Sequence, residues 1–114
     1  MTDPVNLANL REMTGGDAAI ERELFAVFMD SSEKCFANLE ANAAAGQEEA
    51  WRTEAHAWKG MSLNLGAESL GHLCANAQMK NTAPPEEKAK ILAEIKDEYE
   101  KVKQYLKSVY PTTA

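Results

Sequence analysis

Residues 47–65 read QEEAWRTEAHAWKGMSLNL and predict the central helix of the fold. On a helical wheel of about 100° per residue, five of these side chains fall within roughly 40° of one line. The five residues are Trp51, Ala55, Trp58, Ser62 and Leu65. Because two tryptophans and a leucine share this line, we expect it to be the buried face of an amphipathic helix.

The segments on either side of this stretch also have helical patterns, and glycine and proline separate them. Asp3 followed by Pro4 is typical of a helix start, and Asp17 is a suitable N-cap for the next helix. Gly46 is a suitable stop at the end of that second helix. The expected helices cover about residues 4–13, 17–45, 47–65, 67–80 and 84–109.

Apolar side chains recur at three- and four-residue steps on the two longest expected helices. On the helix over 17–45 they are Ile20, Leu24, Val27, Phe28, Cys35 and Leu39. On the helix over 84–109 they are Ile91, Ile95, Val102, Leu106 and Val109. Four long helices with short connections predict an all-α fold, an antiparallel up-down-up-down four-helix bundle with a short extra N-terminal helix.

The composition limits the classes of protein to which this chain can belong. A length of 114 residues predicts one domain over 1–114, and a hydrophobic content of 45% predicts that it folds. Asp and Glu outnumber Lys and Arg by 18 to 12, and a net charge of −6 argues against nucleic acid as a partner. The sequence contains neither a signal peptide nor an apolar run that could span a membrane, so we expect a cytoplasmic protein. As a separate expectation, the protein is a monomer. Cys35 and Cys74 form no paired motif and are expected to be small buried hydrophobes.

His56 lies about 140° from the buried line of its helix, so we expect its imidazole to face solvent. Arg52, Lys59, Gly60 and Leu63 fall on the same side, at spacings where helical side chains meet. A neutral imidazole is a nucleophile near pH 7, and Lys59 could stabilise negative charge on a group that the ring accepts. Glycine inside a helix costs about 1 kcal/mol relative to alanine, so Gly60 suggests the close approach of another molecule. A phosphoryl group carried by a second protein fits these features.

These residues belong to a longer pattern. The segment AHAWKG at 55–60 is followed by Ser62, by NLGA at 64–67, by Leu70 and by Leu73-Cys74. This spaced pattern resembles the signature of histidine phosphotransfer (HPt) domains. The resemblance implies a four-helix bundle in which one exposed histidine carries phosphate between the aspartates of receiver domains.

The resemblance also assigns roles to individual residues. His56 is implied to be the phosphoacceptor, and Lys59 to help hold the phosphoryl group. Gln78 matches a position where many members carry glutamate and some glutamine, and its side chain is implied to orient the imidazole. The residues expected to dock the partner are Arg52, Gly60 and Leu63.

The implied activity is that of a phosphocarrier in a multistep His-Asp phosphorelay, with transfer possible in both directions. The expected partners are receiver domains of response regulators, of hybrid histidine kinases, or of both. The sequence has no glycine-rich nucleotide loop and no acidic cluster suited to Mg²⁺, so we expect no kinase or ATPase activity of its own. We also expect no bound cofactor, with Mg²⁺ supplied by the receiver.

A metal site is the main competing interpretation of the histidines. It would use Glu54, His56, His72 and Cys74, but metal sites in helical bundles use Glu-x-x-His pairs that face inward. No such pair is present, and both histidines are expected to point outward. We therefore expect no metal site, and we interpret His72 as a solvated side chain.

The alternative function is that of a helical adaptor, which would bind receiver or kinase domains through the same surface without accepting phosphate. Met61, Leu63 and Met79 are difficult to bury on the helical wheels, so they form either a docking surface or ordinary exposed apolar positions. Met13 and Met29 are expected to pack in the core or at its edge.

Overall fold

The computed structural model describes residues 4–109, apart from the side chain of Asn9. Every regular element in this part of the chain is an α-helix. The helices are α1 (Ala8–Thr14), α2 (Ala18–Ala41), α3 (Glu48–Leu65), α4 (Glu68–Met79) and α5 (Pro85–Val109). Among them, none combines the length and the apolar character needed to cross a membrane.

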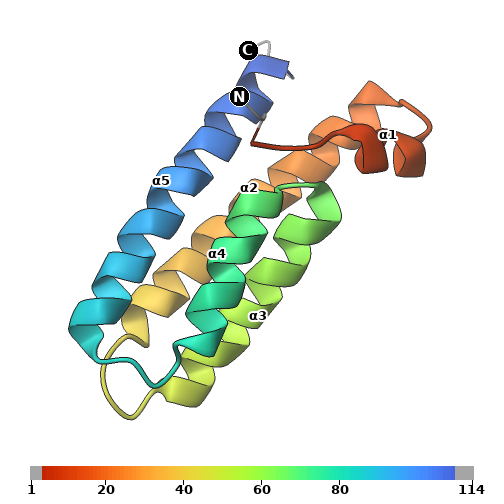
Figure 1. Cartoon of the computed structure of the whole chain (residues 1–114). Helices are drawn as coiled ribbons and strands as arrows, with labels where there is room; N and C mark the ends of the chain where they lie inside the picture. Colours follow the sequence, from red (N-terminus) through yellow and green to blue (C-terminus); the bar gives the residue numbers. More distant parts are fainter. Residues whose placement is uncertain (1–3, 110–114) are drawn as a thin grey trace.

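Helices α2 to α5 form an antiparallel bundle in which each successive helix reverses direction (Figure 1). Helix α3 packs between α2 and α4, and α5 closes the ring by contacting α4 and α2. The short α1 lies against α2 and α3, at the end of the bundle where α2 begins. The predicted all-α bundle with a short N-terminal helix is thus confirmed.

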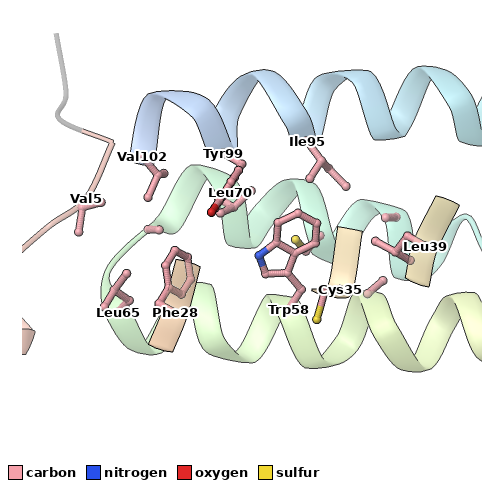
Figure 2. Packing of buried hydrophobic residues seen from close by; sticks show 14 of the residues in the cluster. Val5, Phe28, Cys35, Leu39, Trp58, Leu65, Leu70, Ile95, Tyr99 and Val102 are labelled. Carbon is pink, nitrogen blue, oxygen red and sulfur yellow. The ribbon is translucent and has the colours of Figure 1, made fainter. Parts of the chain in front are cut away.

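The predicted buried face of α3 is confirmed as well. Trp51, Ala55, Trp58 and Ser62 are completely buried, and Leu65 almost so. Trp58 reaches across the core toward Tyr99 of α5, with their ring centroids 6.0 Å apart (Figure 2). Both indole N–H groups are satisfied inside the bundle, as buried donors must be. That of Trp58 donates to Ser32 Oγ at 2.9 Å, and that of Trp51 donates to the carbonyl oxygen of Ala77 at 2.7 Å.

The N-terminal helix begins later than the expected range of 4–13. Asp3 lies outside the described residues, and Pro4 precedes α1 instead of opening it. The amide nitrogen of Asn6 donates to the carbonyl oxygen of Gly66 at 2.8 Å, and Val5 is buried in the core. Because this non-helical segment makes those contacts, helix α1 starts only at Ala8, whose N–H donates to Asn6 Oδ1.

Gly66 allows the N-terminal segment to approach so closely. Its φ of 98° is in the left-handed region, which favours glycine. A Cβ atom at this position would collide with the carbonyl oxygen of Asn6. Gly66, which belongs to the NLGA segment of the motif, therefore has a structural role at the turn between α3 and α4.

Helix α2 ends at Ala41, four residues before the expected limit of the range 17–45. Asn42 ends it, because its side-chain Nδ2 donates to the carbonyl oxygen of Asn38 at 2.7 Å and its backbone N–H bonds to the same carbonyl. An amide side chain that satisfies the last carbonyls competes with a further helical turn. Helices α3, α4 and α5 begin and end within one residue of their expected limits.

The buried face of α2 differs in part from the prediction. Ile20, Leu24 and Val27 are exposed. The buried residues of this helix are Glu21, Phe25, Phe28, Ser32, Cys35 and Leu39. Two apolar rows run along the first half of α2: one contains Ile20, Leu24 and Val27, and the other contains Phe25 and Phe28. The row with both phenylalanines faces the bundle because aromatic rings bury the larger area. The other row stays at the surface beside Met13, which is also exposed, whereas Met29 packs at the edge of the core as predicted.

The predicted row on α5 is largely confirmed, since Ile91, Ile95, Val102 and Leu106 are buried and Val109 is half-buried. Sequence periodicity missed Lys88, which is also buried although it is a lysine. Its Nζ lies 4.9 Å from the centroid of the Trp51 ring. A cation over an indole face is an attractive arrangement, and it offsets part of the cost of burying this charge.

Candidate functional site

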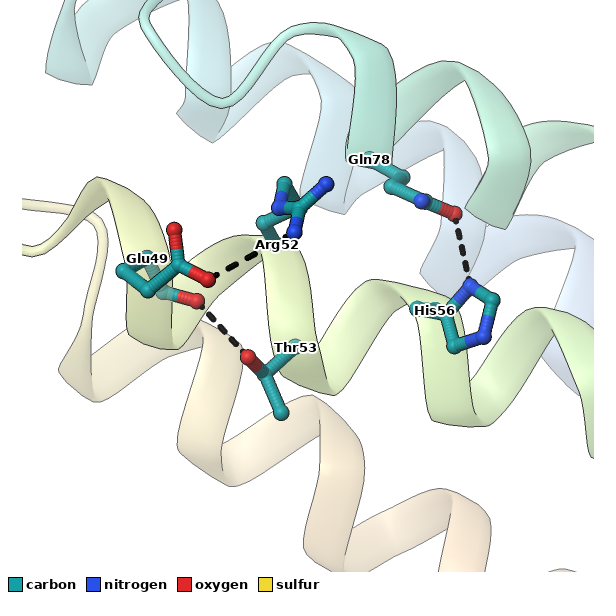
Figure 3. Close-up of polar contacts among 5 residues, drawn as sticks. All are labelled: Glu49, Arg52, Thr53, His56 and Gln78. Atoms are coloured by element: carbon teal, nitrogen blue, oxygen red, sulfur yellow. Dashed lines mark hydrogen bonds and ion pairs between the residues drawn. The ribbon is translucent and has the colours of Figure 1, made fainter.

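His56 lies in the middle of α3, on the side opposite to the two buried tryptophans, and its side chain is exposed as predicted. Its Nδ1 is 3.3 Å from Oε1 of Gln78, which lies in the last turn of α4 (Figure 3). An amide oxygen only accepts hydrogen bonds, so a hydrogen bond between these two atoms requires the ring proton on Nδ1. The other ring nitrogen, Nε2, then presents its lone pair to solvent. This arrangement leaves Nε2 as the ring nitrogen without a contact to Gln78.

Four residues line a small hollow of about 200 Å³ beside the imidazole, namely Arg52, Thr53, His56 and Gln78. Thr53 was not among the residues predicted for the site, although it precedes His56 by three residues and so lies on the same side of the helix. Its hydroxyl donates to the carbonyl oxygen of Glu49 at 2.9 Å. Arg52 forms a 3.6 Å ion pair with Glu49, and both side chains are largely exposed. Exposed pairs of this kind contribute little, so Arg52 is available to a partner.

Lys59 and Gly60 lie beyond this hollow, toward the C-terminal end of α3. Among residues 4–109, no carboxylate forms an ion pair with Lys59, which leaves its ammonium group available to an anion. A Cβ atom added to Gly60 would meet nothing within 4 Å. No contact inside the protein therefore requires glycine at this position, and its absent side chain leaves open space one turn from His56.

An apolar groove of about 190 Å³ lies between α1, α2 and α3. Its lining residues are Leu10, Met13, Leu24, Val27, Phe28, Met61, Asn64 and Leu65. A neighbouring hollow is lined by Glu12, Met13, Leu63 and Asn64. It shares Met13 and Asn64 with the groove, and its Leu63 follows His56 by seven residues on α3. The apolar row of α2 that the sequence analysis assigned to the core therefore lines a surface groove.

The other nucleophilic side chains lie elsewhere or are unreactive. Cys35 and Cys74 are both buried. Burial raises the pKa of the Cys74 thiol to about 12, and burial together with the nearby Glu54 carboxylate raises the pKa of Cys35 to about 11. Both thiols are therefore protonated at neutral pH and do not compete as nucleophiles.

His72 is exposed on α4, as predicted, and it lines a separate hollow with Arg11 and Tyr105. The residues of the competing metal interpretation are not brought together, because Cys74 is completely buried while both histidines are exposed. Among residues 4–109, no three His, Cys, Asp or Glu side chains form a group that could hold a metal ion.

Comparison with known families adds an independent observation. The family model of the Hpt domain matches residues 23–105, which include all of α3 and α4 and therefore both His56 and Gln78. No curated protein and no solved structure gives a significant match to this chain. With a match over most of its length, the chain belongs to the Hpt domain family.

Proposed function

We propose that this protein relays a phosphoryl group between receiver-domain aspartates in a multistep phosphorelay, through a phosphohistidine at His56. Membership of the Hpt family implies histidine phosphotransfer and receiver-domain partners in general terms. The observation that carries the residue-level proposal is the contact between His56 Nδ1 and Gln78 Oε1, which leaves Nε2 free on an exposed helix face. The relay is proposed to act in the cytoplasm, with this protein as a monomer.

In the proposed reaction, His56 Nε2 attacks the phosphorus of an aspartyl phosphate on the receiver. The new N–P bond forms as the P–O bond breaks, and the aspartate carboxylate leaves with the electron pair. The positive charge that develops on the ring is stabilised at Nδ1–H by Gln78 Oε1, and Lys59 is placed to stabilise the negative phosphoryl oxygens. Transfer to the next aspartate is the reverse of this step. The receiver is proposed to supply the Mg²⁺, so this protein acts as a carrier without kinase or ATPase activity.

The surface around His56 is suited to a receiver domain as the second reactant. Arg52 offers a largely exposed cation on one side of the imidazole, and Gly60 offers room on the other. Leu63, which is 40% exposed, leads from there to the apolar groove. An apolar patch that adjoins a polar reactive group is typical of a docking surface for a transient partner. We propose that the receiver covers the groove while its aspartate reaches His56.

A transfer experiment with mapping of the label tests this proposal. The protein is incubated with a panel of phosphorylated receiver domains, and the label is tested for stability in alkali and lability in acid. Trypsin cleaves after Arg52 and Lys59, so His56 lies on the peptide 53–59 and His72 on the peptide 60–80. We expect label on peptide 53–59 only. Label on peptide 60–80 would contradict the assignment, and receiver binding without label would favour an adaptor that does not accept phosphate.

The substitution Gly60→Ala distinguishes the effect of this glycine on phosphotransfer from its effect on stability. Because an added Cβ meets nothing inside the protein, the free energy of unfolding should rise by up to about 1 kcal/mol. The same methyl group should slow transfer from the receiver by narrowing the approach to His56. Urea unfolding and single-turnover transfer measure the two effects. A variant that is more stable but transfers at the wild-type rate would refute the steric role proposed for Gly60.

A further inference from the structure

We propose that Leu63 and Gly71 are positioning residues for phosphotransfer, because their interlocking holds α3 and α4 at the separation that lets Gln78 reach His56. This inference rests on the proposed function for its effect on transfer. Its structural part, the control of the His56 ring by a contact two helical turns away, can be measured without any phosphate.

The first observation is the fit of Leu63 over Gly71. Gly71 is buried inside α4, where a glycine costs about 1 kcal/mol relative to alanine. A Cβ atom at Gly71 would lie 2.5 Å from Leu63 Cδ2 and 2.8 Å from Leu63 Cγ, closer than non-bonded carbon atoms approach. The Leu63 side chain thus occupies the space that any other residue at position 71 would fill. Packing against α3 is the physical reason for a glycine here.

The second observation is the register of the two helices. Helices α3 and α4 are antiparallel neighbours with the most extensive contact in the bundle. Leu63 follows His56 by seven residues on α3, and Gln78 follows Gly71 by seven residues on α4. Seven residues are close to two helical turns, a rise of about 10 Å, so both pairs lie along the same side of the helix pair. The pair Leu63 and Gly71 and the pair His56 and Gln78 are therefore two contacts along a single seam.

The third observation is that the second contact tolerates little displacement. The distance of 3.3 Å between His56 Nδ1 and Gln78 Oε1 is longer than the usual value of about 2.9–3.0 Å for an N–H···O hydrogen bond. A further separation of the helices would weaken it. Which ring nitrogen carries the proton depends on this bond, so its loss would move protons from Nδ1 onto Nε2 and remove the nucleophilic lone pair.

The test uses four variants of the full chain: Gly71→Ala, Leu63→Ala with Gly71→Ala, Gln78→Leu, and Gln78→Leu with Gly71→Ala. The ¹⁵N NMR signals of the His56 ring at neutral pH report which nitrogen is protonated. The sequence has two histidines, so the signals that remain in His72→Gln belong to His56. We expect Gly71→Ala to shift the ring toward the Nε2–H form. Removing Leu63 as well should restore the wild-type signals, because the colliding side chain is gone. Gly60→Ala is the control for these signals, since it adds the same methyl group to α3 without a contact.

Transfer from a phosphorylated receiver gives the second measurement. Gly71→Ala should slow acceptance about tenfold, as should Gln78→Leu, in line with the usual cost of losing a residue that orients a reactive histidine. The variant that combines Gln78→Leu with Gly71→Ala should transfer no more slowly than Gln78→Leu alone, because both changes remove the same hydrogen bond.

Several results would overturn the inference. Unchanged ring signals in Gly71→Ala would mean that Leu63 turns toward solvent and that the helix separation stays the same. If the losses of transfer rate add in the variant that combines Gln78→Leu with Gly71→Ala, then Gly71 acts independently of Gln78. If Gly71→Ala does not fold, Leu63→Ala alone provides the test. Removing the side chain that lies between the helices should let them approach and keep the ring in the Nδ1–H form, and a shift toward the Nε2–H form would contradict the inference. Altered ring signals in a protein that accepts no phosphate would refute the proposed function and leave the positioning role intact.

Discussion

Substituting His56 by glutamine should abolish phosphoryl acceptance, a loss of roughly a thousandfold or more in the transfer rate, because the only proposed nucleophile is removed. Glutamine has a similar length and can still hydrogen bond to Gln78, but its amide nitrogen has no basic lone pair. The His56 side chain is exposed, and its contact with Gln78 is at the surface. The free energy of unfolding should therefore change by no more than about 0.5 kcal/mol. Single-turnover transfer and urea unfolding measure the two quantities.

The matched control is His72→Gln, which makes the same chemical change on the neighbouring helix α4. It should leave the transfer rate at the wild-type value. Affinity for the unphosphorylated receiver should be close to wild type in both variants, since the groove and its apolar lining do not include either histidine. If His56→Gln still accepts label, then His56 is not the acceptor. If it loses receiver affinity in proportion to transfer, the lost transfer reports binding and not the chemical step.

The parts of the fold that could be predicted are those that depend only on the sequence of one helix. Helix α3 carries one apolar line, and the line contains two tryptophans, so its buried face and the exposed position of His56 both follow from a period of 3.6 residues. The contact with Gln78 was reached only through the family resemblance. Periodicity places Gln78 on a helix, but it does not determine which residue of a neighbouring helix comes opposite.

The parts that could not be predicted depend on contacts between segments. Helix α2 has two apolar rows, and its own sequence does not tell which row the bundle covers. The late start of α1 depends on the hydrogen bond between Asn6 and Gly66, sixty residues apart. Thr53 lines the hollow beside His56 only because Gln78 closes it from α4. In each case the missing information is tertiary, and a propensity or a pattern along one segment does not contain it.

Substituting Trp51 by alanine should lower the free energy of unfolding by about 3–5 kcal/mol, the usual cost of removing a large buried aromatic side chain. Trp51 is completely buried. Its loss would leave a cavity between α3, α4 and α5, and the carbonyl oxygen of Ala77 would lose the indole N–H that donates to it at 2.7 Å. Because small domains are stable by about 5–15 kcal/mol, this is a large fraction of the total. Urea unfolding followed by the fluorescence of the remaining Trp58 measures it.

Trp51→Phe is the matched control, since it keeps an aromatic ring but removes the N–H donor. We expect it to cost about 1–3 kcal/mol, the penalty for one buried group left without its partner. A loss in Trp51→Phe equal to that in Trp51→Ala would mean that the hydrogen bond matters more than the filled volume.

The effect of Trp51 should also depend on Lys88, whose buried ammonium group lies over the indole ring. In the wild type, Lys88→Met removes an attractive contact between the cation and the ring, which is worth up to about 2 kcal/mol in a desolvated site. In the Trp51→Ala background the cation has lost that partner, so Lys88→Met should cost less or should increase stability. A double-mutant cycle over the two positions measures the difference, and strictly additive losses would show that the ring does not stabilise the buried charge. A positive coupling energy would explain why a lysine can lie in the core row of α5, where the sequence pattern alone gives no reason to expect one.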